Sequence, residues 1–375
     1  MSRPKPQVLV LIDWYKPFFK AGGPVRSMVN MVDHLHGEVD FHIITGDRDY
    51  TATAAPADLP KDRWVQLDQG EHVWYASPEG RSIQRWKELL HQRPWDAVYI
   101  NGLWSRWGTL VPLWLLRGSG QRRIVAVRGM LAHGVMGRKG LLKRLVLFAL
   151  RATGCFRGVE FQATNREEMD DVRRWVGRDV QVHLVPNLGR RMADHTPRPI
   201  AKQRGELRLV SVARIAEEKN TLFAIERLKD LPGRVSFDLY GTVYHEAYWE
   251  RCRQVIAALP PHITVQWHGQ IDSDAVPQVL AGAHALFMPS VGENFGHTML
   301  EALAVGRPIV ISDRTPWKGL EAQHAGWDLP LEKPERFAEV LRSLVGMDDA
   351  AYRPWCAGAF ALAARSLADP AARER

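Results

Sequence analysis

The second half of the chain contains, at residues 289–312, the stretch PSVGENFGHTMLEALAVGRPIVIS. Short apolar runs lie at its two ends, at residues 285–288 and 308–311. Phe295 to Thr298 begin a helical pattern between these runs, so the order is strand, loop, helix and strand. This order is typical of a parallel sheet that is covered by helices, and it predicts an α/β fold.

The same alternation continues before this stretch. Further apolar or β-branched runs occur at residues 8–12, 39–45, 96–100, 123–127, 159–163, 180–185, 207–212, 235–240 and 263–267. A polar, basic segment without periodicity, residues 189–206, separates the two series. We therefore predict two Rossmann-like domains with parallel sheets that face a central cleft, where ligands of such folds bind beyond the carboxyl ends of the strands.

A chain of 375 residues is long enough for two domains of ordinary size. The predicted parts are an N-terminal domain at residues 1–190, a linker at 191–206, a second domain at 207–348 and a helical segment at 349–375. No stretch approaches the roughly 20 apolar residues of a membrane span. Asp13 interrupts the first apolar run, which we interpret as a strand and not as a signal peptide.

The cysteines and the charges restrict the location of the protein. Cys155, Cys252 and Cys356 are far apart and lack metal-ligand spacing, which favours a reduced cytoplasmic protein without structural zinc.

The formal net charge is +8, and all eleven charged residues between Asp96 and Glu160 are basic. This basic block suits nucleic acid, an anionic membrane surface or a phosphorylated substrate.

One helical pattern within the basic block has two interpretations. Residues 140–151, GLLKRLVLFALR, combine apolar side chains with Lys143, Arg144 and Arg151. An interfacial helix at the inner face of the plasma membrane has this composition. A buried helix whose cationic ends extend to water has it as well. The sequence leaves both interpretations open.

Two carboxylates flank the loop and helix of the opening stretch. Glu293 precedes the turn, and Glu301 follows it within the helix. The unpaired N–H groups at a helix N-terminus suit sugar or phosphate oxygens. Both carboxylates can therefore face one ligand, with one on sugar hydroxyls and the other on a ribose.

Two cations follow the first strand of the second series, in the segment VSVARIAEEKN at residues 210–220. Arg214 and Lys219 are five residues apart. A leaving nucleoside diphosphate needs its growing negative charge neutralised, and such a pair supplies this. The sequence therefore indicates a phosphate-binding turn beside the two carboxylates.

Together with Ser290 and the segment Gly306–Val310, these residues resemble the donor-site signature of glycosyltransferase family 4, the group 1 glycosyltransferases of the GT-B fold. The resemblance is specific only over residues 207–331. It implies that Arg214 and Lys219 grip the donor diphosphate and that Glu293 supports the sugar. It also implies donor contacts from a set of neighbouring residues: Asn294, Phe295, Gly296, His297, Thr298 and Glu301.

The N-terminal domain matches this family loosely. Gly22 and Gly23 lie in the first turn and can allow close approach to the donor phosphate or the acceptor. Asn101, Arg128 and His133 are candidates for the acceptor side. Many relatives carry a histidine where Arg128 stands, so its role departs from the pattern.

The resemblance implies a retaining transfer of a hexosyl group from a nucleotide diphosphate sugar to an acceptor hydroxyl. The basic block favours a lipid-linked or polysaccharide intermediate as the acceptor. We expect no cofactor and no metal, although residues 47–49 and 272–274 have the DxD form of metal-dependent enzymes. The alternatives are a nucleotide-sugar epimerase or hydrolase on the same fold, and a basic nucleic-acid-binding protein, which lacks a supporting motif here.

Overall fold

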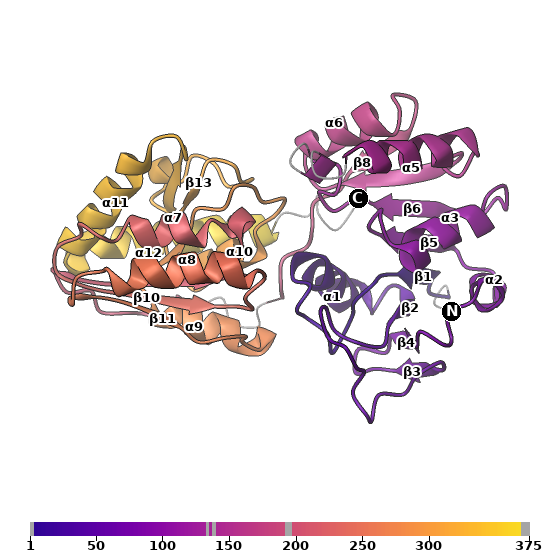
Figure 1. Cartoon of the computed structure of the whole chain (residues 1–375), viewed down its shortest axis with the longest axis horizontal. Helices are drawn as coiled ribbons and strands as arrows, with labels where there is room; N and C mark the ends of the chain where they lie inside the picture. The colour runs from indigo at the N-terminus through magenta and orange to yellow at the C-terminus, as the bar shows by residue number, and fades with distance from the viewer. Residues whose placement is uncertain (1–3, 133–134, 137–139, 192–196, 369–375) are drawn as a thin grey trace. The chain divides into compact units, whose positions relative to one another are not determined.

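A computed structural model describes residues 4–132, 135–136, 140–191 and 197–368 of the chain. The chain forms two compact units, which meet in the sequence after Arg191 (Figure 1). The predicted linker, residues 191–206, includes five residues that lie outside this description. Each unit is an α/β structure, so the predicted fold class is confirmed.

The first unit contains one sheet with helices on both faces (Figure 1). Its elements are β1 (Gln7–Leu11), α1 (Gly23–Leu35), β2 (Asp40–Gly46), β3 (Trp64–Gln66), β4 (His72–Ala76), α2 (Ile83–His91), β5 (Ala97–Asn101), a π-helix (Arg106–Leu110), α3 (Val111–Leu115), β6 (Arg123–Ala126), α5 (Gly140–Ala152), β7 (Val159–Ala163), α6 (Arg166–Trp175) and β8 (Gln181–Leu184). The strand order is β3-β4-β2-β1-β5-β6-β7-β8. β3 runs antiparallel to β4, and the other pairings are parallel.

The second unit repeats this design with the strand order β11-β10-β9-β12-β13-β14, in which the pairings are parallel. Its elements are β9 (Glu206–Val212), α7 (Thr221–Glu226), β10 (Arg234–Tyr240), α8 (Glu246–Ala257), β11 (Ile263–Trp267), α9 (Val276–Gly282), β12 (Ala285–Met288), α10 (His297–Ala304), β13 (Ile309–Ser312), β14 (Gly326–Leu329), α11 (Pro334–Gly346) and α12 (Asp349–Ala368). Short 3-10 turns precede α7, α9 and β14.

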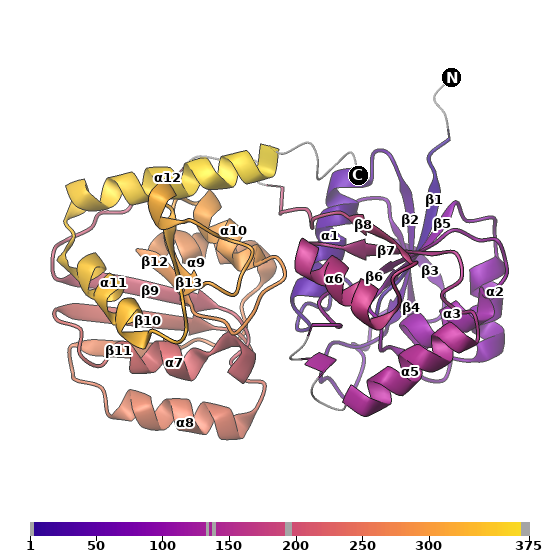
Figure 2. The same ribbon diagram turned by 90° about the horizontal axis from the view of Figure 1, so that it is seen from above.

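Both sheets are buried on their two faces, as parallel sheets require. In β9, Leu207 and Leu209 pack with α7, α8 and α11, whereas Val210 and Val212 pack with α9, α10 and α12. Figure 2 shows these two groups of helices on opposite sides of the sheet. The two-residue alternation of strand side chains therefore places the helices and directs the strand ends toward the loops.

Three strands were not predicted from the sequence: β3, β4 and β14. β3 has only three residues, and β4 has only five, of which the last four are buried. The predicted helical character of residues 349–368 is confirmed, and α12 packs against α10 in the second unit. Within the described residues, no helix has both the length and the apolar character needed to cross a membrane.

Because two histidines are buried, we expect the free energy of unfolding to fall in mild acid. Burial lowers the pKa of both His42 and His284 to about 4. The unfolded chain takes up these protons near pH 6.5, whereas the folded chain takes them up only near pH 4, so acid favours unfolding across this window. We expect the fully buried His284 to account for up to about 3 kcal/mol of lost stability by pH 4.

Urea denaturation at pH 7 and pH 5 checks this expectation. Most carboxyl groups are still ionised at pH 5, so the histidines dominate the change over this interval. An unfolding free energy that stays constant from pH 7 to pH 5 would contradict the prediction.

Candidate active site

The predicted donor residues of the second unit follow two neighbouring strands. Arg214 and Lys219 follow β9, and Glu293 follows β12. β9 and β12 are paired in parallel, with Leu209 opposite Ala285. The carboxyl ends of both strands therefore lie at the same edge of the sheet, and the loops after them are neighbours.

Lys219 and Glu293 form an ion pair at the centre of this edge. Nζ of Lys219 lies 2.5 Å from Oε1 of Glu293, and both side chains are mostly shielded from solvent. The buried hydroxyl of Ser290 donates to the same carboxylate oxygen over 2.9 Å. The backbone N–H of Glu293 donates to the carbonyl of Arg314, so the carboxylate is fixed by its main chain as well.

The loops after β9 and β12 are joined by a backbone hydrogen bond. The N–H of Val291 donates to the carbonyl of Glu218, at 2.9 Å. The turn that carries Lys219 ends at Asn220, which has a left-handed conformation with a φ of 58° and precedes α7. Lys219 is therefore held between a short 3-10 turn and a helix start, and its amine reaches the loop after β12.

Arg214 lies beside this pair with part of its guanidinium exposed. Its Nη2 donates to Oε1 of Glu218 over 3.0 Å, and the guanidinium lies 5.0 Å from the ring centroid of Tyr244. An arginine offers five N–H donors, so this arrangement leaves further donors available to a ligand. Tyr244 and Glu218 thus orient a cation close to Lys219.

The helix α10 begins at the same edge of the sheet. Gly296 precedes it with a φ of 76°, a conformation that favours glycine, and the first helical residue is His297. The hydroxyl of Thr298 donates to the carbonyl of Val212 at the end of β9, over 3.2 Å. Nε1 of Trp317 donates to the carbonyl of Phe295 and fixes the chain before the turn. The N-terminus of α10 therefore lies against the strand that leads to Arg214.

Glu301 and Asn294 complete the predicted donor set. Glu301 lies on α10 one turn after His297, and its side chain is almost fully buried. Asn294 lies between Glu293 and Phe295 in the loop that leads to the helix. The structure thus gathers the predicted donor residues of the second unit at one sheet edge, while their roles remain predictions.

Sequence reasoning missed the residues that hold this edge in place. They are Glu218, Gly241, Tyr244, Arg314 and Trp317. Only Gly241 had a usable signal, because a glycine directly after an apolar strand often marks a close backbone approach. The others act through tertiary contacts that sequence spacing does not reveal.

Arg128 of the first unit belongs to a network at the carboxyl ends of β5 and β6. Its Nε donates to Oδ1 of Asn101 over 2.7 Å, its Nη2 donates to the hydroxyl of Tyr99 over 2.7 Å, and its Nη1 donates to Oδ1 of Asn187. Nδ2 of Asn101 in turn donates to the carbonyl of Pro24 over 3.4 Å. The structure therefore brings Arg128 and Asn101 together beside the first turn.

Gly22 and Gly23, the two glycines of that turn, have open space around them. Gly22 has a φ of 79°, which favours glycine, whereas Gly23 is the first residue of α1. A Cβ atom on either residue would meet no other atom within 4 Å. The backbone of this turn is therefore open to a ligand. The third acceptor-side candidate, His133, lies outside the described residues.

The first unit also has a polar pocket of about 400 Å³ at the carboxyl ends of β1, β2 and β4. Asp13, Arg81 and Trp107 are among the residues that line it. The hydroxyl of Ser105 donates to Oδ1 of Asp13 over 2.5 Å, and burial raises the pKa of this carboxyl. Sequence reasoning missed Asp13 as a site residue, although its position directly after a buried strand was a signal.

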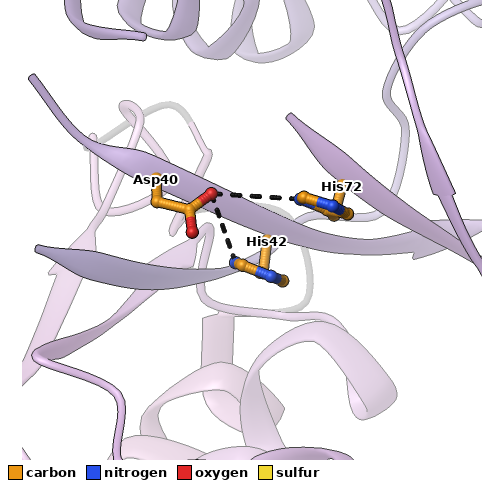
Figure 3. Close-up of side chains that lie close together, drawn as sticks. All are labelled: Asp40, His42 and His72. Carbon is orange, nitrogen blue, oxygen red and sulfur yellow. Dashed lines mark ion pairs between the residues drawn. The ribbon is translucent and has the colours of Figure 1, made fainter. Parts of the chain in front are cut away.

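The DxD triplet at residues 47–49 has partners within the protein. Asp47 is buried and pairs with Arg48 at 3.0 Å, and Oδ1 of Asp49 accepts from the backbone N–H of Lys20. A group that suits a metal better lies elsewhere in the first unit and consists of Asp40, His42 and His72 (Figure 3). It is at the amino-terminal ends of β2 and β4, opposite the strand ends that carry the pocket.

Comparisons with known proteins agree with this architecture. Residues 193–353 match the model of the family "Glycosyl transferases group 1". Over 171 residues the chain is 28% identical to the putative colanic acid biosynthesis glycosyltransferase WcaL of Escherichia coli (strain K12). That alignment covers 44% of this chain and 42% of WcaL, so the chain matches less than half the length of this curated relative.

Solved structures resemble the whole chain at low sequence identity. Sucrose-phosphate synthase from Thermosynechococcus elongatus has a TM-score of 0.73 at 16% identity, with 96% of this chain and 94% of that chain covered. WaaG, a glycosyltransferase of lipopolysaccharide biosynthesis, has a TM-score of 0.65 at 15% identity, with 96% and 95% covered. Anabaena HepE, in complex with UDP-glucose, has a TM-score of 0.66 at 13% identity, with 98% of both chains covered.

These likenesses and the two α/β units show that the chain has the GT-B fold. The strand ends with Arg214, Lys219 and Glu293 lie inside the segment that the family model matches. Over this segment, the chain is similar to the group 1 glycosyltransferases. This match agrees with the family that the donor-site motif predicted.

Proposed function

We propose that the protein is a retaining glycosyltransferase that moves a hexosyl group from a nucleotide diphosphate sugar to an acceptor hydroxyl. The observation that carries the proposal is the Lys219–Glu293 ion pair, with Arg214 beside it, at one edge of the second sheet. Anabaena HepE, which has the same fold, was solved with UDP-glucose, and this supports a nucleotide sugar as the donor.

The two cations would bind the donor diphosphate. Charge develops on the leaving phosphate as the glycosidic bond breaks, and preorganised cations stabilise that charge. Arg214 presents a planar guanidinium that suits two phosphate oxygens, and Lys219 adds a compact positive charge. No metal is needed for this neutralisation, so we propose a metal-independent transfer.

Glu293 and the start of α10 would bind the sugar. The carboxylate of Glu293 can accept hydrogen bonds from sugar hydroxyls and stabilise positive charge at the anomeric carbon. The loop and the first turn of α10, residues 294–298, would contact the sugar and phosphate oxygens, and Glu301 would bind the ribose. Retention follows in this proposal from attack on the face that the phosphate leaves, with that phosphate taking the acceptor proton.

The acceptor is proposed to be a lipid-linked or polysaccharide intermediate. WcaL and WaaG are described as enzymes of colanic acid and lipopolysaccharide biosynthesis, which supports a cell-envelope acceptor. Asn101 and Arg128 border the open turn at Gly22 and are proposed to shape the acceptor side. The polar pocket beside Asp13 offers further contacts for a saccharide.

A calorimetric titration with UDP, GDP, ADP and dTDP tests the donor site. We expect one diphosphate to bind clearly better than the others, and we expect Arg214→Ala and Glu301→Ala to weaken it by at least about tenfold. Arg227→Ala is the matched control, because Arg227 lies in the same unit at the end of α7 and away from this strand edge. If no diphosphate binds at millimolar concentration, the donor-site assignment is wrong.

Further assays distinguish the proposed transferase from the two alternative functions. A nucleotide-sugar epimerase or hydrolase would consume the donor at full rate without an acceptor, whereas a transferase needs one. A nucleic-acid-binding protein would bind random DNA with a steep dependence on salt concentration. Donor turnover that requires an acceptor is therefore the result that favours the proposal.

The helix α5 presents an apolar face to solvent. Leu141, Leu142, Leu145 and Phe148 are 75%, 62%, 56% and 71% exposed, whereas only Leu147 and Leu150 of this helix are buried. The interpretation of residues 140–151 as a buried helix is therefore wrong. Lys143 and Arg144 lie over the rings of Trp104 and Trp175 and flank the apolar face.

We propose that this face rests on an anionic membrane at the inner side of the plasma membrane. Exposed leucine and phenylalanine side chains insert into the headgroup region, and the surrounding cations attract anionic lipids. This arrangement would hold the first unit close to a lipid-linked acceptor. The surface also agrees with the predicted peripheral location of a cytoplasmic protein.

Substituting serine for both Leu142 and Phe148 should abolish most of the binding to vesicles. The loss of two inserted side chains lowers the affinity by about tenfold or more, while the fold is preserved because both side chains are exposed. Co-sedimentation with vesicles of phosphatidylethanolamine and phosphatidylglycerol measures the effect. Ile83→Ser, on α2, is the control, because Ile83 is an isolated exposed apolar residue. Equal binding of wild type and the double variant would contradict the prediction.

A further inference from the structure

Three potential metal ligands meet at the amino-terminal ends of β2 and β4. Asp40 and His42 are two residues apart on β2, so their side chains point to the same face of the sheet. His72 is the register partner of His42 on β4. The backbone pairing alone therefore brings the three side chains together, and Figure 3 shows them pointing toward one another.

Two of the three atoms that face one another lack a hydrogen-bond partner among the described residues. Oδ1 of Asp40 lies 3.9 Å from Nδ1 of His42 and 3.9 Å from Nδ1 of His72. Both Nδ1 atoms are buried, and neither has a hydrogen-bond partner in the part of the chain that the structure describes. His42 as a whole is only 2% exposed. A buried polar atom without a partner costs about 1 to 3 kcal/mol, so this cluster is unsatisfied as it stands.

We propose that Asp40, His42 and His72 bind a divalent transition metal ion of the zinc type. Two imidazoles and one carboxylate form a ligand set that suits Zn²⁺, and an ion between them would satisfy both unpartnered nitrogens. Asp40 and His72 are each about one-third exposed, so water can fill a fourth position. Neither the proposed sugar transfer nor the donor-site motif assigns this site.

The three ligand atoms must move closer together to bind the ion. Zinc–ligand distances of 2.0 to 2.2 Å place tetrahedral ligand atoms roughly 3.4 Å apart. The three ligand atoms here lie within 4.8 Å of one another, so they must approach by up to about an ångström. The rings of His42 and His72 are stacked, with 4.7 Å between centroids and 6° between planes. His72 must therefore tilt, which its partial exposure permits.

The hydrogen bond from Arg93 to His42 must break when the ion binds. Its Nη1 donates to Nε2 of His42 over 3.2 Å, and a guanidinium cannot accept, so the ring proton lies on Nδ1 in the metal-free chain. Metal binding at Nδ1 moves this proton to Nε2 and displaces Arg93. The displacement is accessible because Arg93 is only partly buried, over the ring of Trp95. No net proton is released from His42, and burial keeps this ring neutral by lowering its pKa to about 4.

The position of the cluster indicates what the ion would do. It would link β2 to β4 at the end of the sheet opposite the Gly22 turn and the polar pocket. The ion would thus stabilise the first unit and take no part in the transfer reaction. Its binding is independent of the nucleotide.

Calorimetry of the untagged chain with zinc chloride tests the site. We expect one ion per chain for the wild type, an affinity at least about tenfold lower for His72→Ala, and a higher affinity for Arg93→Ala. His91→Ala is the matched control, because His91 is an exposed histidine of α2 outside the cluster. The proposal is overturned if the wild type binds no zinc, or if His72→Ala and His91→Ala bind it equally.

A second measurement separates this site from general zinc binding and from the donor site. Zinc should raise the Tm of the wild type and of His91→Ala, and should leave the Tm of His72→Ala and Asp40→Asn unchanged. An equal Tm shift in all four proteins would overturn the proposal. Nucleotide titrations on the same samples show whether the donor site is intact, so the two proposals fail independently.

Discussion

Replacing Lys219 with alanine will lower kcat/KM for sugar transfer by about 100- to 1,000-fold. The amine of Lys219 forms a mostly shielded ion pair with Glu293, and in the proposed reaction it neutralises the leaving diphosphate. The substitution removes this charge and leaves the carboxylate beside the donor phosphates without its cation. Repulsion between the two anions therefore adds to the loss.

The measurement is the release of nucleoside diphosphate from the donor that the titration identifies. Lys229→Ala is the control, because Lys229 is an exposed lysine shortly after α7 and should leave the rate unchanged. Lys219→Arg should recover part of the activity, since it restores the charge but not the compact geometry. A rate for Lys219→Ala within about threefold of the wild type would remove Lys219 from the proposed mechanism.

Replacing Gly241 with alanine will destabilise the second unit by about 3 kcal/mol or more. Gly241 has a φ of 140°, and a Cβ atom would lie 2.0 Å from the carbonyl oxygen of Ala213. That carbonyl belongs to backbone, so it cannot move aside without shifting the segment that carries Arg214. We therefore expect Gly241→Ala protein that still folds to bind the donor more weakly.

Gly269→Ala is the matched control for this substitution. Gly269 also has a positive φ, of 76°, but a Cβ atom there would meet nothing within 4 Å. Its substitution should cost only the conformational strain of about 1 to 2 kcal/mol. Chemical denaturation of both variants gives the comparison. Equal midpoints for the two would show that the contact with Ala213 is not the cause.

The fold was largely predictable because parallel strands that are buried on both faces leave long apolar runs. β9 and β12 were both recognised in this way, and the loops after them carried the donor-site motif. β4 was missed although residues 73–76 form a short buried apolar run. The sequence also could not show that His72 pairs with His42, since register between strands far apart in the chain depends on the assembled sheet.

The sequence indicated which donor-side candidates would lie together, but it did not indicate the surroundings of the acceptor-side candidate Arg128. Lys219 and Glu293 carry opposite charges on loops whose strands have a fixed order in such sheets. Arg128 instead has a φ of 52°, and its guanidinium turns into a network with Asn101 and Tyr99. The left-handed backbone conformation of this arginine follows from local packing, and residue type alone does not indicate it.

The pairing of Lys219 with Glu293 also determines which anions the donor site should refuse. Inorganic phosphate, which is abundant in cells, competes with the carboxylate for the amine of Lys219, and it offers Glu293 nothing in return. A nucleotide sugar brings hydroxyl groups for the carboxylate together with phosphates for the amine. We therefore expect the ion pair to favour a complete nucleotide sugar over its phosphate part alone.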